Sequence, residues 1–251
     1  NEHTYILRQN PAIHWEAPFM YLLMGNQQAL LLDAGATEEE EFFPLSGVID
    51  GILQSWAHAH RVEIPDLIVM PLGSDQSQTA ALDQFAERPE TNIFAPGSEA
   101  RANVIADQQL DLGGRVLSVL PTPGLNDSAI TIYDPWSDLL LTGNTFYPGR
   151  LVIRDFDAYR GSLQRLVKLA KEEPISHIFG GRIEMTNRPG LDHRLRSNYR
   201  PGEHSLQLEP RLLETALQAV NLINGETDIR ILDDFILMNG VGRGARDWGF
   251  P

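Results

Sequence analysis

Polar side chains that could bind or transform a small molecule follow a short apolar run, residues 67–70. This run has the length and apolar character of a buried strand. The loop after it carries Asp75 and Ser77 and leads into a helical pattern that includes residues 80–85. A loop between a strand and a helix is a common place for functional side chains, because the scaffold holds it rigidly. This loop is therefore the centre of the candidate site.

The residue types allow several kinds of chemistry. Asp75 and Asp127 could share acid–base work, although a cap for a local turn is the better interpretation of Asp127. Ser77 would need a histidine within reach to act as a nucleophile, and no Gly-x-Ser-x-Gly pattern is present. Tyr147 could serve in acid–base chemistry. Arg182 could anchor a carboxylate or a phosphate.

Strands that alternate with helices must position these side chains, which indicates an α/β layered fold. The clearest helix spans residues 45–56, where apolar residues recur at helical spacing. The acidic run at residues 38–41 is interpreted as the solvated start of this helix. His58 and His60 fall at its end. Because residues two apart face different sides of a helix, we interpret both as exposed polar residues and not as a metal pair.

Further segments complete the expected secondary structure. Amphipathic patterns predict helices at residues 163–170 and 212–220, and a helix is also expected at residues 96–106. Strands are expected at residues 5–7, 19–24, 29–33, 92–95, 115–120, 129–133, 139–142, 176–179, 229–232 and 235–238.

The candidate loop and its surroundings resemble the metallo-β-lactamase superfamily from about residue 20 to about residue 204. At the position of this loop, that family has the motif His-x-His-x-Asp-His, which binds two metal ions. The alignment puts four residues at the ligand positions: Gly73, Asp75, Ser77 and Gln78.

Three further family landmarks follow in the expected order, as TPGL at residues 122–125, LTGN at 141–144 and FGGR at 179–182. Leu125 replaces the histidine of a Pro-Gly-His motif, and Asn144 replaces the aspartate of a Thr-Gly-Asp motif. Arg182 replaces a final histidine. The resemblance implies a four-layer αββα sandwich, in which helices flank two mixed sheets.

The same alignment implies that the family's metal site has been lost. A divalent ion needs three or four nitrogen, oxygen or sulfur donors. Gly73 and Leu125 offer no side-chain donor, and Arg182 carries a fixed positive charge. Asp75 is the one strong ligand that remains. We therefore predict no zinc, no zinc-activated water and no other cofactor, and an ion pair between Asp75 and Arg182.

Composition narrows the function classes further. The chain has 251 residues, 42% of them hydrophobic, which suits one domain over residues 1–251 with a loose tail at 239–251. Its net charge of -14 argues against nucleic acid and anionic membrane surfaces. No apolar run has transmembrane length, and there is no cysteine. The compartment stays open between cytoplasmic and secreted or periplasmic, and so does the oligomeric state.

Three functional hypotheses follow. The favoured one is a metal-free protein that has lost hydrolase activity. It would bind a small molecule or a protein partner through the former active-site cleft, including an anionic ligand at Arg182. The alternative is a metal-independent hydrolase, lyase or isomerase that uses Asp75, Asp127 or Tyr147 with Arg182. A third, weaker hypothesis is residual hydrolysis with metal held by unorthodox ligands.

Overall fold

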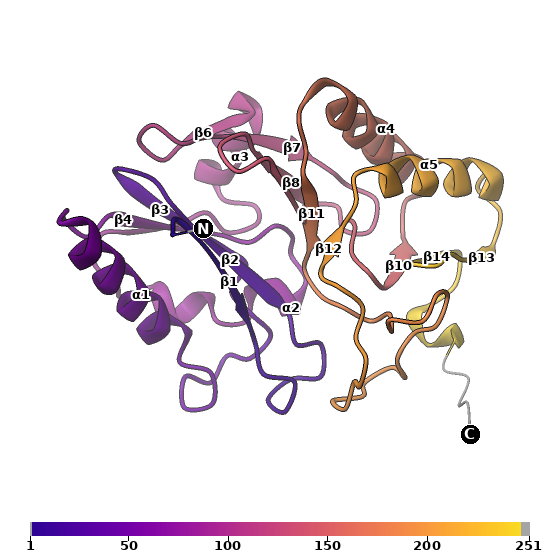
Figure 1. Cartoon of the computed structure of the whole chain (residues 1–251), viewed down its shortest axis with the longest axis horizontal. Helices are drawn as coiled ribbons and strands as arrows, with labels where there is room; N and C mark the ends of the chain where they lie inside the picture. Colours follow the sequence, from indigo (N-terminus) through magenta and orange to yellow (C-terminus); the bar gives the residue numbers. More distant parts are fainter. Residues whose placement is uncertain (1, 247–251) are drawn as a thin grey trace. The chain divides into compact units, whose positions relative to one another are not determined.

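Five strands form one sheet in the first part of the chain, in the order β1-β2-β3-β4-β5 (Figure 1). The strands β1, β2 and β3 pair antiparallel, and β3, β4 and β5 pair parallel. The strands expected at residues 19–24 and 29–33 form the antiparallel pair of β2 and β3. The bounds are β1 (Thr4–Arg8), β2 (Phe19–Met24), β3 (Gln28–Leu32), β4 (Asp66–Met70) and β5 (Thr91–Ile93).

The computed structural model describes residues 2–246, and the chain divides into two compact units. Unit 1 is Asn1–Ser118 and unit 2 is Val119–Pro251. Each unit has a hydrophobic core of its own.

Helix α1 (Leu45–His60) packs on the core of unit 1 through Leu45, Ile49, Leu53 and Trp56. Their helical spacing is the pattern that predicted this helix. The acidic run at residues 38–41 was wrongly expected to begin it. That run lies in a turn, and the helix begins only after Pro44. A residue before proline is disfavoured in the helical conformation, which prevents an earlier start.

Two short helices follow β4, where the sequence predicted one continuous helix: α2 (Gln76–Thr79) and the 3-10 helix η1 (Leu82–Phe85). The break has a clear cause. The backbone N–H of Ala81 donates to the carbonyl of Ala34, 3.1 Å away, and so leaves the helical ladder. Unit 1 also holds α3 (Glu99–Asp107) and β6 (Gln109–Asp111), which pairs with the first residues of β7 (Val116–Pro121).

Unit 2 contains two sheets. Strands of the larger sheet follow the order β12-β11-β9-β8-β7, and those of the smaller follow β10-β14-β13. Neither β10 nor β12 was expected from the sequence. The strands of the two sheets that follow β7 have the bounds β8 (Ile130–Asp134), β9 (Leu139–Gly143), β10 (Arg150–Ile153), β11 (His177–Gly180), β12 (Gln207–Leu208), β13 (Asp228–Ile231) and β14 (Ile236–Asn239).

Two amphipathic helices, α4 (Phe156–Glu172) and α5 (Arg211–Ile223), pack against each other in unit 2 (Figure 1). Asp155 caps α4 by accepting a hydrogen bond from the N–H of Ala158. Among residues 2–246, no helix has both the length and the apolarity needed to cross a bilayer.

The tail predicted to be loose from residue 239 onward is partly structured. Asn239 ends β14, and Arg243–Arg246 forms the 3-10 helix η2. The rest of the predicted loose tail, residues 247–251, lies outside the described residues.

Candidate functional site

A buried carboxylate, Asp33, lies behind the candidate loop of unit 1. It follows β3, is 1% exposed and adopts the left-handed conformation with φ of 66°, which aspartate tolerates better than most residues. The N–H of Leu72 donates to its Oδ1 over 2.7 Å. The side-chain amide of Gln78 donates to both carboxylate oxygens, at 3.0 and 3.2 Å. Gln78 therefore fixes the loop onto Asp33.

The environment of Asp33 disfavours its charge. Burial raises its pKa to about 7, although the donors from Leu72 and Gln78 and the positive charge of Arg101 act in the opposite direction. Burial likewise lowers the pKa of Arg101 to about 10. Arg101 is 2% exposed, and its guanidinium donates to the carbonyl of Pro71. Two buried ionisable side chains, Asp33 and Arg101, thus hold the backbone of this loop through hydrogen bonds to Leu72 and Pro71.

Of the other ligand-position residues of unit 1, Asp75 and Ser77 lie at the start of α2 and Gly73 lies in the loop before it. Asp75 is the N-cap residue, half-buried, and its carbonyl accepts from the N–H of Gln78 at 2.8 Å. Its carboxylate makes no side-chain cap hydrogen bond with the helix. Ser77 is buried, as is Gly73.

In unit 2, three glycines make room for the bulky side chains of the corresponding loops. A Cβ atom on Gly149 or Gly180 would lie 2.3 Å from an atom of Tyr147, and one on Gly181 would lie 2.8 Å from Oδ1 of Asn144. Tyr147 is fully buried, and its hydroxyl donates to the carbonyl of Arg150 over 2.8 Å. Burial raises the pKa of Tyr147 well above its ordinary value, which keeps this hydroxyl protonated.

Arginine residues surround a second buried carboxylate, Glu184, which is 2% exposed. The backbone N–H of Arg150 donates to its Oε2 at 2.7 Å, and the guanidinium of Arg243 forms an ion pair with its Oε1 at 3.8 Å. The guanidinium of Arg182 lies over the ring of Tyr147, 5.0 Å from the centroid. The last of these is a cation–π contact.

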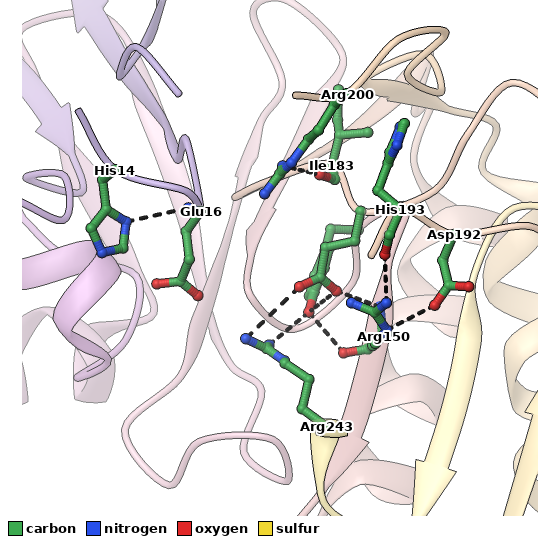
Figure 2. A network of polar contacts seen from close by, with 10 residues as sticks. His14, Glu16, Arg150, Ile183, Asp192, His193, Arg200 and Arg243 are labelled. Atoms are coloured by element: carbon green, nitrogen blue, oxygen red, sulfur yellow. Dashed lines mark hydrogen bonds and ion pairs between the residues drawn. The ribbon is translucent and has the colours of Figure 1, made fainter. Parts of the chain in front are cut away.

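The arginines also position the neighbouring chain segments (Figure 2). Arg150 pairs with Asp192 at 2.8 Å and donates to the carbonyl of His193 at 2.6 Å. Arg200 donates to the carbonyl of Ile183 at 2.7 Å. Beside this network lies a cavity of about 660 Å³, lined by Thr186, Asn187, Arg188, Leu191, Asp192, His193, Pro201 and Gly202.

The charges in this network act strongly on each other. Burial would raise the pKa of Glu184, but the positive charges of Arg243, Arg182 and Arg150 hold it below its ordinary value. Burial, followed by repulsion from Arg243 and Arg200, lowers the pKa of Arg182 to about 9 despite the attraction of Glu184. Arg182 is 3% exposed. A negative charge next to Arg182 would therefore stabilise its charged form.

The candidate residues from the sequence divide between the two units. Asp75 belongs to unit 1, while Asp127, Tyr147 and Arg182 belong to unit 2. The predicted ion pair between Asp75 and Arg182 would join the units and stays a prediction. Asp127 is exposed in a turn, where the side chain that accepts from the N–H of Ser128 is that of Asn126; a capping role for Asp127 stays a prediction. Leu125 and Asn144 are both buried.

Two features of the site do not follow from the sequence pattern. The pattern places Asp33 at a strand end, although its position in an Asp-x-Gly turn after an apolar run was a usable signal. The other feature is the set of groups around Glu184, whose carboxylate accepts from the backbone of Arg150. Nothing in the sequence pattern brought Arg150 and Arg243 to it.

The donor set does not fit the two metal ions for which these loops are built in the resembling family. Gly73 and Leu125 supply no donor, and the amide of Gln78 is directed to Asp33. Arg182 adds a positive charge. Within residues 2–246, one group of three histidine or acidic side chains has ligand atoms close enough for a shared ion, and it contains none of these residues.

Comparison with known proteins identifies the fold. No family model matches the sequence, and no curated protein matches it. The structure, however, is similar to solved metallo-β-lactamase structures. The chain therefore has the metallo-β-lactamase fold, and the predicted α/β αββα class is confirmed.

Three of these structures illustrate the likeness. A metallo-β-lactamase from Pontibacter korlensis matches with a TM-score of 0.57 and 14% identity, over 88% of this chain and 96% of that chain. An archaeal superfamily protein from Sulfolobus tokodaii has a TM-score of 0.54 and 15% identity, over 96% and 91%. A Pseudomonas aeruginosa metallo-β-lactamase in a mono-zinc form has a TM-score of 0.56 and 8% identity, over 88% and 92%. At such identities the likeness establishes the fold and no substrate.

Proposed function

We propose that this protein binds a small anionic molecule, bearing a carboxylate or phosphate group, through the loops of unit 2 that carry Arg182, and that it does so without metal-dependent hydrolysis. The observation that carries the proposal is the burial of Arg182 among other arginines, which lowers its pKa to about 9. An anion would relieve this repulsion and would match the planar guanidinium fork.

The surrounding groups support binding more than acid–base catalysis. Tyr147 is buried, its hydroxyl is engaged with Arg150, and its pKa is raised. Glu184 has a lowered pKa and so remains charged at neutral pH. A catalytic acid or base would need a pKa near the working pH. These two groups therefore suit a rigid binding wall.

A thermal-shift series tests the proposal. The purified chain is heated with phosphate, citrate, acetate or chloride at matched ionic strength. We expect saturable stabilisation by one of the first three, since a ligand at 100 times its Kd adds about 2.7 kcal/mol of stability. Arg182→Met, which keeps the length but removes the charge, should abolish the shift.

Arg160→Met is the matched control, because Arg160 lies on the partly exposed face of α4 in the same unit and its loss changes the net charge equally. It should leave the shift intact. Stabilisation that survives in Arg182→Met, or is lost equally in both variants, would contradict binding at Arg182. Zinc-dependent turnover of a lactam, lactone or ester would contradict the absence of metal-dependent hydrolysis.

A further inference from the structure

Side chains from two separate segments of unit 1 meet at the end of α1: Glu2 and His3 from the segment before β1, and His60 from the helix itself. Glu2 and His3 precede β1, and His60 is the last residue of the helix. Nε2 of His3 lies 3.5 Å from Oε1 of Glu2, and Nε2 of His60 lies 3.9 Å from Oε2 of the same carboxylate. Their ligand atoms all lie within 4.8 Å of one another.

These separations suit a tetrahedral ion. Two donors at about 2.0–2.2 Å from zinc, with tetrahedral angles between the bonds, lie roughly 3.3–3.6 Å apart. The three ligand atoms, one from each residue, lie within 4.8 Å of one another and must move closer to reach this spacing. The Glu2 side chain is 74% exposed and can adjust to both rings, whereas the His3 and His60 side chains, at 24% and 27% exposed, must shift toward each other. Water can complete the coordination from the exposed side.

His60 is already oriented as a metal ligand. Its Nδ1 lies 2.8 Å from the carbonyl oxygen of Trp56, which can only accept, so Nδ1 carries the proton. Nε2 of the neutral ring then presents its lone pair on the side of Glu2. A backbone carbonyl that fixes the tautomer in this way is the usual outer partner of a metal-binding imidazole. The sequence interpretation of His60 as an exposed helix-end residue is therefore wrong, because its ring is part-buried and stacked on Trp56.

His3 couples the same site to Trp56. The indole N–H of Trp56 donates to Nδ1 of His3 at 3.1 Å, which leaves the proton of the neutral imidazole on Nε2. Coordination of a neutral imidazole through Nε2 requires that proton to move to Nδ1, which can then no longer accept from Trp56, so the hydrogen bond must break. Metal coordination by His3 therefore competes with the hydrogen bond from Trp56 to His3.

We propose that Glu2, His3 and His60 bind a divalent ion of the zinc type and thereby fasten the segment before β1 to the end of α1. Two imidazoles and a carboxylate are borderline donors that suit zinc, nickel or copper more than calcium or magnesium. This site uses none of the ligand positions of the metallo-β-lactamase loops and is independent of anion binding at Arg182.

The first test is calorimetric titration of the tag-free full chain with zinc chloride, in a buffer that does not bind metal. We expect one site in the wild type. His60→Ala should weaken binding at least tenfold. His58→Ala is the matched control, because His58 is exposed and lies two residues earlier on the same helix; its loss should change the affinity less than twofold.

The second test uses the competition at His3. Trp56→Phe keeps an aromatic ring beside His60 but removes the indole N–H. It should tighten zinc binding about fivefold, the equivalent of one net hydrogen bond. In the wild type, copper should quench the fluorescence of Trp56, whose ring centroid lies 4.6 Å from that of His60; His60→Ala should abolish this quenching.

Three results would overturn the proposal. They are a wild-type chain that binds no zinc, zinc binding that is unchanged in His60→Ala, and equal losses in His58→Ala and His60→Ala. Zinc binding that is unchanged in His60→Ala would mean that the ion binds at another site, for example at the loops that hold the metal in the metallo-β-lactamase family. If Trp56→Phe folds poorly, the copper quenching of the wild type and of His60→Ala decides the question.

Discussion

The buried carboxylate of Asp33 should make the stability of the protein depend on pH in a defined direction. Its pKa is about 7 in the folded protein, against an ordinary value near 3.8. The folded state therefore binds this proton more tightly than the unfolded state. The stability from this group is fully present below about pH 4 and is lost as the pH rises to 7.

The size of the effect follows from the shift. Roughly three pKa units at about 1.36 kcal/mol each give a loss on the order of 4 kcal/mol between pH 4 and pH 7. No discount for solvent screening applies, since Asp33 is only 1% exposed. Asp33→Asn should remove this loss. Asparagine tolerates the φ of 66° and can still accept from Leu72. The amide of Gln78 can turn to accept from it.

Urea unfolding from pH 4 to pH 9 measures the effect. The difference in unfolding free energy between Asp33→Asn and wild type cancels the other titrating groups. It should rise from near zero at pH 4 to about 4 kcal/mol at pH 7 and then level off. Asp66→Asn, at an exposed aspartate of β4, should show no such rise. A flat difference curve for Asp33→Asn would refute the reasoning.

The remaining predictions concern Glu184 and two glycines. Glu184→Gln should destabilise the protein by about 3–5 kcal/mol at pH 7, because it removes the negative charge that offsets the buried guanidinium of Arg182 and breaks the ion pair with Arg243. Since the pKa of Glu184 is lowered, its stabilisation should fade as the pH falls below about 4; equal urea midpoints for Glu184→Gln and for Glu203→Gln, at the edge of the network, would contradict this. Gly149→Ala should cost about 1–3 kcal/mol, because the new methyl group meets Tyr147. Gly47→Ala in α1 meets no atom within 4 Å and should add about 0.5–1 kcal/mol, and thermal unfolding compares the two.

Much of the fold could be predicted because its elements carry periodic patterns. The spacing of Leu45, Ile49 and Leu53 has one periodic solution, a helix with an apolar face. Strand β10 escaped because it is only four residues long and begins with a charged residue, Arg150. Its burial depends on Asp192, which lies far along the chain.

The candidate site was less accessible to sequence reasoning. Ligand positions could be assigned from their order along the chain, but the partners of each side chain could not. The donors that hold Asp33 come from residues remote in sequence, and the pKa of a carboxylate depends on such neighbours. The metal-like cluster at His60 was missed for the same reason, since a local pattern does not show what approaches the end of a helix.

The hydrogen bond from Gln78 to Asp33 makes this loop a practical starting point for protein engineering. A histidine at position 78 could donate one ring N–H to Asp33 and present its other nitrogen to solvent, as metal-binding histidines do. The supporting carboxylate is already buried and anchored by Leu72. A designer who wished to install a metal centre here would thus find the outer support in place and would need to supply the remaining ligands.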